Sequence, residues 1–365
     1  MGFNCGIVGL PNVGKSTLFN AVTASHAEAS NYPFCTIDSN VGVVAVPEPR
    51  LERLAAIVGA PKAIPTHIEF VDIAGLVRGA SRGEGLGNQF LARIREVDAI
   101  VHLVRCFDDP NVAHVDGSVD PRRDIEVVQA ELILKDLDTV ERRLGEVQKR
   151  AKSGDRKLKT ETEFYGRLRD HLHRGAAARS FAVAPGEEPV WMRDMHLLTD
   201  KPGMYVCNVH EHDLGRETPR VAAVREIASG EGAPVVTVSA EVEAEIAELA
   251  EGERQSFLEG LGVEESGLHK VIRTGYALLH LLTFFTWNAK EARAWTVRQG
   301  ATAPEAAGKI HTDFERGFIR AEVASFEDLD RFGSEHALRE AGLIHTHGRD
   351  YVIRDGDVVY FRFNV

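Results

Sequence analysis

The chain has 365 residues, enough for about two to three domains that each bury a sizeable hydrophobic core. Its 43 basic and 55 acidic residues give a formal net charge of −12, which argues against capture of nucleic acid by overall charge. The 4 cysteines are widely spaced and no apolar run approaches the ~20 residues of a membrane span, which argues against a disulfide framework, a zinc site and membrane insertion. We therefore expect a cytoplasmic protein, in which any nucleic-acid contact comes from a local basic patch.

Apolar runs rich in β-branched residues predict strands, and helical stretches separate several of them. The predicted strands are residues 5–8, 41–46, 68–71, 99–104, 204–209 and 235–238. Apolar strands that alternate with helices are typical of a mostly parallel sheet covered on both faces. The sequence thus predicts an α/β domain over residues 1–125 and 200–281.

A different pattern interrupts this domain over residues 126–199. Apolar residues recur at alternating spacings of 4 and 3 over residues 133–151, and a similar pattern resumes over residues 158–172 after a break at residues 153–155. This is the spacing of a coiled-coil seam. We expect a helical insertion that folds back on itself as a hairpin.

Residues 282–365 predict a separate, smaller α+β domain. Short strands are expected at residues 283–286, 294–297 and 318–323. A capping box at residues 302–305 predicts the start of a helix. Near the end of the sequence, Asp355-Gly356 is expected to join residues 351–353 and 358–361 as a β-hairpin.

The clearest functional motif lies between the first predicted strand and the helix that follows it. Residues 9–16, Gly-Leu-Pro-Asn-Val-Gly-Lys-Ser, match the P-loop pattern G-x-x-x-x-G-K-[ST], for which the alternative is an ordinary glycine turn. In a P-loop, backbone N–H groups surround the phosphates, Lys15 would contact the β- and γ-phosphates, and the Ser16 hydroxyl would ligate Mg²⁺. The expected nucleotide-binding residues here are Asn12, Val13, Gly14, Lys15, Ser16 and Thr17.

A second phosphate-side element follows at Asp72 to Gly75. Asp72, at the end of a buried strand, would hold Mg²⁺ through water, and the Gly75 N–H would sense the γ-phosphate in a glycine-containing loop able to open and close. Thr36 is the candidate for the remaining Mg²⁺ hydroxyl. Taken singly, these are common turn and surface residues, so the interpretation depends on their conjunction with the P-loop.

The turn after the predicted strand 204–209 is the candidate base site. A guanine-specific site would have N-K-x-D here, with an aspartate that accepts hydrogen bonds from two guanine donors, whereas this chain has Asn208-Val209-His210-Glu211. Val209 removes the lysine stem that would lie over the base, and Glu211 displaces the carboxylate by one methylene. We therefore expect the preference for GTP to weaken or invert. Ser239 and Ala240 would add backbone contacts to the base, and a polar strand-end turn is the alternative for the whole group.

With these residues, the chain resembles the YchF or Obg-like ATPase family of P-loop NTPases over essentially all 365 residues. The resemblance rests on residues 9–17, 72–76, 83–88, 208–211 and 308–318. It implies a GTPase-like domain, a coiled-coil insertion and a C-terminal TGS domain of ubiquitin-like shape. It also implies hydrolysis of ATP in preference to GTP, and association with ribosomes.

The residue that would assist hydrolysis is less evident. Ras-like enzymes orient the attacking water with a glutamine where this sequence has Leu76, which cannot bond water. The family resemblance points to a histidine in the loop after the predicted strand 99–104, and His114 matches it. A neutral imidazole could orient the water or accept its proton. The alternative is an ordinary surface-loop histidine.

The expected tip of the helical hairpin is a local basic patch in which Asp155 is the one opposing charge. Its residues are Lys149, Arg150, Lys152, Arg156, Lys157 and Lys159. Such a patch suits contact with RNA phosphates, although charge runs on helices are often solvated faces. We expect the ribosome to bind this tip and the TGS domain, and the chain to act as a monomer.

The sequence therefore predicts a Mg²⁺-dependent switch that associates with ribosomes and hydrolyses ATP, in preference to GTP, to ADP and phosphate. Two alternatives stay open, a conventional GTPase of the Obg group and a nucleotide-binding module with negligible turnover. A P-loop kinase is disfavoured because nothing in the sequence resembles an acceptor-substrate pocket or lid.

Overall fold

The computed structural model describes residues 3–24, 40–73, 93–151, 155–185 and 187–364. The chain divides into two compact units. The first comprises residues 1–43 and 69–271, and the second comprises residues 44–68 and 272–365.

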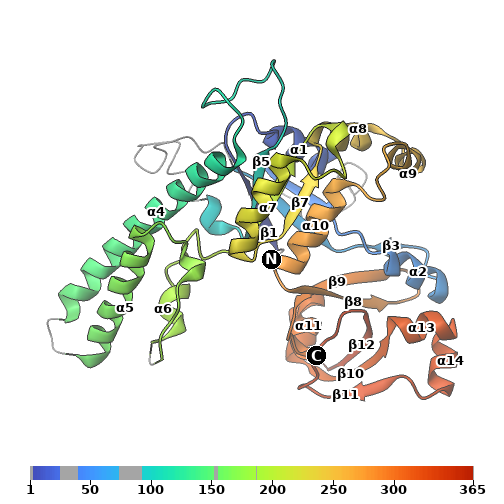
Figure 1. The fold of residues 1–365 in the computed structure, drawn as a ribbon. Coiled ribbons are helices and arrows are strands. Elements are labelled where there is room, and N and C mark those ends of the chain that lie inside the picture. Colours follow the sequence, from blue (N-terminus) through green and yellow to red (C-terminus); the bar gives the residue numbers. More distant parts are fainter. Residues whose placement is uncertain (1–2, 25–39, 74–92, 152–154, 186, 365) are drawn as a thin grey trace. The chain divides into compact units, whose positions relative to one another are not determined.

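The first unit is built on a sheet of six strands (Figure 1). In spatial order they are β2 (Val41–Ala45), β4 (His67–Asp72), β1 (Asn4–Val8), β5 (Ala99–Arg105), β6 (Gly203–Asn208) and β7 (Val235–Val238). Neighbouring strands from β4 to β7 are parallel, as the sequence predicts. All 7 residues of β5 are buried, as expected for a central strand covered on both faces.

Helices of this part of the chain lie between successive strands or follow β7. They are α1 (Lys15–Ala24), α7 (Pro219–Glu231), α8 (Ala240–Glu248), α9 (Glu251–Gly260) and α10 (Gly267–Leu278). Helix α1 packs against α8, while α7 packs Val221 and Val224 into a core with Tyr205 and Cys207 of β6. Because the strands are parallel, the loops after β1, β5, β6 and β7 meet at one edge of the sheet, where α/β proteins bind ligands.

The predicted helical insertion is a hairpin of α4 (Pro121–Ala151) and α5 (Arg156–His173). Residues of the predicted seam, including Val140, Leu144, Tyr165 and Leu168, are buried in its core. The elements η2 (Ala178–Ser180) and α6 (Pro189–Arg193) follow and complete this core. Helix α4 has 31 residues but many charged side chains, and no helix in the described ranges is long and apolar enough to cross a membrane.

A buried carboxylate fixes the hairpin to the segment that returns to the sheet. Asp136 of α4 accepts hydrogen bonds from the backbone N–H groups of Leu198 and Thr199 and from the Thr199 hydroxyl, at 2.7 to 2.8 Å. Burial raises the pKa of Asp136, and these hydrogen bonds oppose that rise. Because residues 198–199 precede β6, the contact holds α4 close to the sheet.

The second unit contains another sheet of six strands. In spatial order they are β11 (His345–His347), β10 (Phe318–Ser325), β12 (Asp357–Phe363), β8 (Leu281–Trp287), β9 (Ala292–Arg298) and β3 (Ala63–Ile64). Its helices are α2 (Pro49–Val58), α11 (Ala303–Ile310), α12 (Thr312–Arg316), α13 (Phe326–Phe332) and α14 (Glu335–Glu340). Helix α11 begins at the predicted capping box, in which the Glu305 carboxylate accepts from the Thr302 N–H at 2.7 Å. The unit has the predicted α+β character, and its identity as a TGS domain stays a prediction.

Residues 44–68, which the sequence analysis placed in the α/β domain, belong to the second unit. Strand β3 pairs with β9 and so extends that unit's sheet. Leu51 and Leu54 of α2 are buried in the same core as Phe285 of β8. Strand β3 and helix α2 are thus neighbours of the α/β segments in sequence, but they pack with residues that lie more than 200 positions further along the chain.

The prediction of a β-hairpin at Asp355-Gly356 is wrong. Val352 forms an isolated bridge with Thr302, and β12 pairs with β10 and β8 rather than with residues 351–353. The Asp355 side chain accepts from the Thr283 N–H at 2.9 Å, and the Gly356 N–H donates to the Thr283 carbonyl at 2.9 Å. These contacts tie the turn to β8, so its two arms do not pair with each other.

Candidate nucleotide-binding site

The P-loop between β1 and α1 has a backbone conformation that few residues adopt. Asn12 and Gly14 have positive φ angles of 61° and 95°. A Cβ atom on Gly14 would overlap the side-chain amide of Asn208, and one on Gly9 would overlap the carbonyl oxygen of Leu103. Close packing therefore requires glycine at both positions, and at Gly14 the backbone conformation requires it as well.

Asn208, the last residue of β6, joins the P-loop to the turn after β7. Its Nδ2 donates to the Val13 carbonyl at 3.0 Å, and its Oδ1 accepts from the Ala240 N–H at 2.9 Å. Asn208 is only 4% exposed, so water competes little for these hydrogen bonds. One side chain thus holds the predicted phosphate-binding and base-binding segments together.

Lys15, which is buried, and Asp72, which is half-buried, are the charged residues on the phosphate side of the site. Lys15 Nζ donates to the carbonyls of Gly9 and Leu10 at 3.1 and 2.9 Å. Burial lowers the pKa of Lys15, and the Asp72 carboxylate opposes this change. Burial raises the pKa of Asp72, against the influence of Lys15 and Arg93, and the Asp72 Oδ1 is buried with no hydrogen-bond partner among the described residues. This oxygen is therefore available to a cation.

A pocket of about 490 Å³ lies beside the P-loop at the carboxyl edge of the sheet. Ligand pockets in proteins commonly have volumes of about 300 to 1,000 Å³, so this one can hold a nucleotide. Its lining residues are Asn12, Gly14, Lys15, Ser16, Thr17, Phe107, Asp109, Val112, Asn208, Val209, His210, Ser239, Ala240 and Glu241.

Phe107 and His210 form an aromatic wall of this pocket. Their rings meet edge to face with centroids 5.4 Å apart, and the Arg105 guanidinium lies 4.6 Å from the centre of the Phe107 ring. The His210 Nε2 lies 2.7 Å from the Asp108 carbonyl oxygen, which makes this nitrogen the protonated donor. With Val209 buried beside it, the wall offers an apolar surface to a flat ring.

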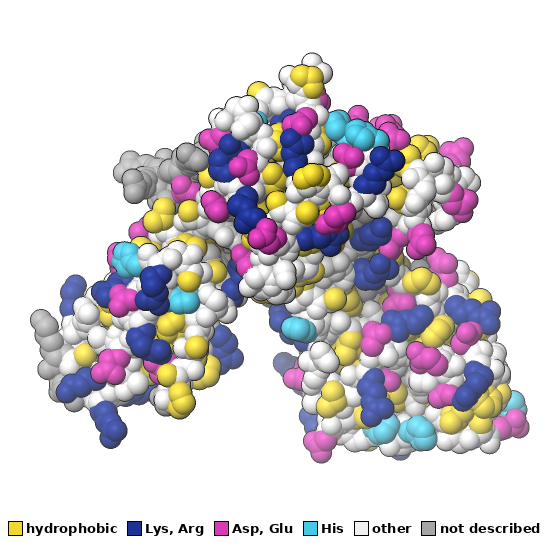
Figure 2. Space-filling view, viewed as in Figure 1, with side chains coloured by type: hydrophobic (Ala, Val, Ile, Leu, Met, Phe, Trp, Pro, Cys, Tyr) yellow, Lys and Arg dark blue, Asp and Glu magenta, His cyan; other side chains and the backbone are white. Residues whose placement is uncertain are grey.

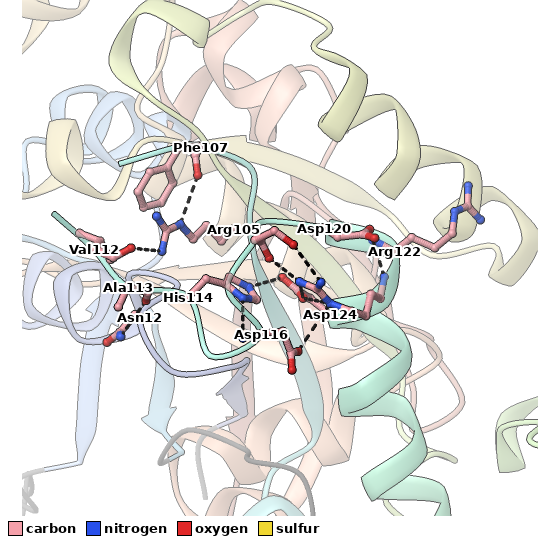
Figure 3. A network of polar contacts seen from close by, with 12 residues as sticks. Asn12, Arg105, Phe107, Val112, Ala113, His114, Asp116, Asp120, Arg122 and Asp124 are labelled. Carbon is pink, nitrogen blue, oxygen red and sulfur yellow. Dashed lines mark hydrogen bonds and ion pairs between the residues drawn. The ribbon is translucent and has the colours of Figure 1, made fainter. Parts of the chain in front are cut away.

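Residues 106–120, here called the pocket loop, connect β5 to α4 and are held from two sides (Figure 3). Arg105 is 2% exposed. Its guanidinium donates at 3.0 to 3.3 Å to the carbonyls of Phe107, Asp109 and Val112. From the P-loop, Asn12 Nδ2 donates to the Ala113 carbonyl at 3.1 Å. The sheet and the P-loop thus both shape the wall that the pocket loop supplies.

His114, the predicted catalytic residue, belongs to the pocket loop but does not line the pocket. Its Nε2 lies 2.8 Å from the Asp124 Oδ2, and its Nδ1 accepts from the Asp116 N–H at 3.1 Å. The side chains of His114 and Asp124 are 4% and 5% exposed. Both ring nitrogens are therefore bonded within the protein in this arrangement.

The same residues could be taken for a metal site, since His114, Asp116 and Asp124 bring possible ligand atoms close together. The Arg123 guanidinium, however, lies 3.1 Å from Asp124 and 3.5 Å from Asp116. Because Arg123 already supplies the positive charge between these carboxylates, we assign no metal ion to the cluster.

Comparison with known proteins identifies the family. Residues 4–141 match a family model described as a 50S ribosome-binding GTPase, and residues 281–364 match the YchF C-terminal model, described as a protein of unknown function (DUF933). The chain is 55% identical to the ribosome-binding ATPase YchF of Escherichia coli O157:H7 over 365 residues, which cover 100% of each chain. The chain belongs to the YchF family. The ribosome-binding ATPase YchF of Bacillus subtilis (strain 168) is 52% identical over 367 residues, again covering 100% of both.

A solved YchF structure confirms the predicted fold class. The Schizosaccharomyces pombe YchF GTPase matches with a TM-score of 0.87 and 36% sequence identity, and the match covers 99% of this chain and 98% of that chain. The mostly parallel, P-loop GTPase-like sheet and the C-terminal domain are therefore features of the YchF fold.

The YchF fold brings most of the predicted site residues into one pocket. Those that line it are Asn12, Gly14, Lys15, Ser16, Thr17, Asn208, Val209, Ser239 and Ala240. Val13 is buried and contributes its carbonyl to Asn208, while Glu211 is exposed at the start of η3 (Glu211–Asp213) and is not a lining residue. Thr36 and Gly75 lie outside the described residues.

The sequence analysis did not assign site roles to several residues of this YchF pocket. These are Phe107, Asp109, Val112 and His210. Each lies in a segment that follows a predicted strand of the parallel sheet, and this position is the signal that could have marked them. The loop that carries Phe107, Asp109 and Val112 is shaped by the Arg105 contacts, and the sequence does not show these.

Replacement of Arg105 by lysine (Arg105→Lys) is expected to weaken nucleotide binding by about tenfold, because a lysine has no planar fork with which to hold three separate carbonyls. Isothermal titration calorimetry measures this change. Arg220→Lys is the matched control, since Arg220 contacts the same loop through the exposed side chain of Asp108. If Arg105→Lys bound nucleotide as tightly as the unaltered chain, the proposed support of the pocket by Arg105 would be wrong.

Proposed function

We propose that this chain is a Mg²⁺-dependent nucleoside triphosphatase that prefers ATP to GTP and works on ribosomes. The observation that carries the proposal is the single pocket in which the P-loop meets a base turn with Val209 in place of lysine. The ribosome-binding ATPases of Escherichia coli and Bacillus subtilis, which match over their full lengths, support it. Work on ribosomes places the protein in the cytoplasm, and we propose that it acts as a monomer.

Adenine preference follows from what the base turn offers. The aromatic wall of Phe107 and His210 can stack on either purine, so it does not discriminate between them. A preference for guanine would need a carboxylate that accepts hydrogen bonds from the two N–H donors of the guanine base. Glu211, the residue in that position of the turn, is exposed and does not line the pocket. Guanine would therefore bury unpaired donors in this pocket, whereas adenine would leave fewer polar groups unsatisfied.

The triphosphate would lie over the P-loop at the N-terminus of α1, where backbone N–H groups and the Lys15 ammonium favour negative charge. The Ser16 hydroxyl and Asp72, through water, would hold Mg²⁺, with Thr36 as a further ligand. When bound, this ion would neutralise charge that develops on the phosphates. Asp72 suits the role because its buried Oδ1 has no hydrogen-bond partner among the described residues.

His114 is proposed to orient the attacking water, and the Gly75 N–H to contact the γ-phosphate. Support for His114 comes from its place in the chain, since the neighbouring Ala113 carbonyl accepts a hydrogen bond from Asn12 of the pocket lining. Leu76, next to Gly75, has no group that could orient water. For this role His114 would have to leave Asp124.

The basic tip of the helical hairpin is the proposed contact with ribosomal RNA. Figure 2 shows Lys and Arg side chains spread over the hairpin. Of the predicted tip residues, Lys149, Arg150, Arg156, Lys157 and Lys159 are exposed, and Lys152 lies outside the described residues. Lys157 forms an ion pair with Glu188 at 2.9 Å, so Asp155 is not the sole opposing charge. Arg156 and Lys159 therefore provide the sharper test. The C-terminal unit, as a proposed TGS domain, would add a second contact.

Restoring a guanine-type turn tests the base preference. The double variant Val209→Lys with Glu211→Asp is expected to raise the ratio of kcat/KM for GTP to that for ATP by about tenfold or more, because it restores the lysine stem and shortens the carboxylate. Steady-state release of phosphate with each nucleotide measures the ratio.

Because Val209 is buried, thermal unfolding of the double variant is measured in parallel to check that it folds. Glu211→Asp alone serves as the milder variant, since it leaves Val209 in place. An unchanged ratio in a folded double variant would remove the base turn from the account. Nucleotide binding without phosphate release by the unaltered chain in a single turnover would favour the module with negligible turnover.

Charge reversal at the tip tests the RNA contact. Arg156→Glu with Lys159→Glu is expected to lower ribosome co-sedimentation at least about tenfold at low salt, because each reversal replaces attraction to phosphate with repulsion. Arg225→Glu on α7 is the control for a charge change elsewhere on the surface. Binding that is unchanged and insensitive to salt in the double variant would exclude the tip as the contact.

A further inference from the structure

The contact between His114 and Asp124, here called the latch, lies where the pocket loop joins α4 (Figure 3). Asp124 belongs to the first turn of α4, while His114 is 10 residues earlier in the chain. The two side chains are almost completely buried, so the hydrogen bond of 2.8 Å between them is shielded from water. A charged acceptor in such surroundings makes a stronger hydrogen bond than a neutral one.

The latch directs the His114 ring away from a pocket that its own backbone adjoins. The Ala113 carbonyl accepts from Asn12, a residue of the pocket lining. The next side chain, His114, is turned to α4 and makes hydrogen bonds with Asp124 and the Asp116 N–H. The backbone next to His114 is thus anchored at the pocket lining, while the His114 ring is bonded on the side of α4.

The surroundings of the latch favour a local release. Arg105 holds the part of the loop that ends at Val112, before the latch begins. After it, the Gly117 N–H donates to the His114 carbonyl at 3.0 Å, and Gly117 has a φ of 77°, so residues 114–117 form a compact turn of their own. Arg123 bonds the other Asp124 oxygen, Oδ1, at 3.1 Å and would keep that carboxylate neutralised when His114 leaves.

We propose that Asp124 is a positioning residue that keeps His114 out of the pocket, so that nucleotide hydrolysis requires the latch to open. This proposal rests on the catalytic role proposed above for His114. Asp124 acts through His114 and does not touch the nucleotide. Because α4 continues from Asp124 to the basic tip at Lys149 and Arg150, the latch also connects the pocket loop to the helix that would meet the ribosome.

Asp124→Asn tests the latch because it removes the charge but keeps the shape of the side chain. The variant is expected to raise kcat for ATP by about fivefold with KM little changed, since a weaker latch leaves His114 free for a larger fraction of the time. Hydrogen–deuterium exchange of the full chain is expected to be faster in peptides that cover residues 112–118. In a His114→Ala background, Asp124→Asn is expected to change kcat no further.

Arg122→Gln is the matched control on the same helical turn, because Arg122 pairs with Glu226 at the surface and leaves the latch intact. If Asp124→Asn lowers the melting temperature markedly, Asp124→Ser repeats the test with a smaller polar side chain. A fall in kcat, or unchanged turnover and exchange, overturns the proposal. If His114→Ala, made as a single substitution, leaves turnover intact, the catalytic role of His114 fails, while the exchange experiment still reports whether Asp124 holds the loop.

Discussion

The side-chain amide of Asn208 makes one site out of segments that are distant in sequence. It donates to the Val13 carbonyl of the P-loop and accepts from the Ala240 N–H at the start of α8, so the loops after β1, β6 and β7 share one hydrogen-bonded centre. Gly14 lacks a Cβ where that amide approaches. In this account, the two hydrogen bonds of Asn208 set the spacing between the phosphate end and the base end of the pocket.

The pocket loop is bonded to the P-loop through Asn12, and it also connects the site to β5 and to α4. Its first half is tied to the sheet through Arg105, and its second half is tied to α4 through Asp124. These anchors differ in kind. The Arg105 guanidinium donates to three backbone carbonyls of the loop, whereas the latch is one hydrogen bond between two side chains. In the proposed mechanism, the Arg105 attachment would keep the pocket wall in place while release of the latch moves His114.

The extent to which the sequence predicts this structure depends on whether a feature is encoded locally. The P-loop was predictable because its glycines, lysine and serine act through their own backbone and side chains, and the seam around Val140 and Tyr165 was predictable because burial along a helix is periodic. The partners of a segment are not encoded in this way. Residues 44–68 have ordinary strand and helix patterns, yet they join a core that includes Phe285.

The same limit applies within the site. Asn208 and Val209 stand in a recognisable turn, so their part in the pocket follows from the motif. The buried Arg105 ends β5 and Phe107 follows it without a motif, and their role emerges only when the loop folds back over the guanidinium. For His114, the family resemblance implied a catalytic group, but it could not show that Asp124 bonds the ring.

The most direct test of this account is a calorimetric titration of the Asn208→Ala variant with ATP in the presence of Mg²⁺, beside the unaltered chain. The substitution leaves the Val13 carbonyl and the Ala240 N–H without their partner, at a cost of about 1 to 3 kcal/mol in binding. The account predicts a dissociation constant for ATP about 5 to 150 times higher in a variant that still unfolds cooperatively. An unchanged dissociation constant in such a variant would contradict it.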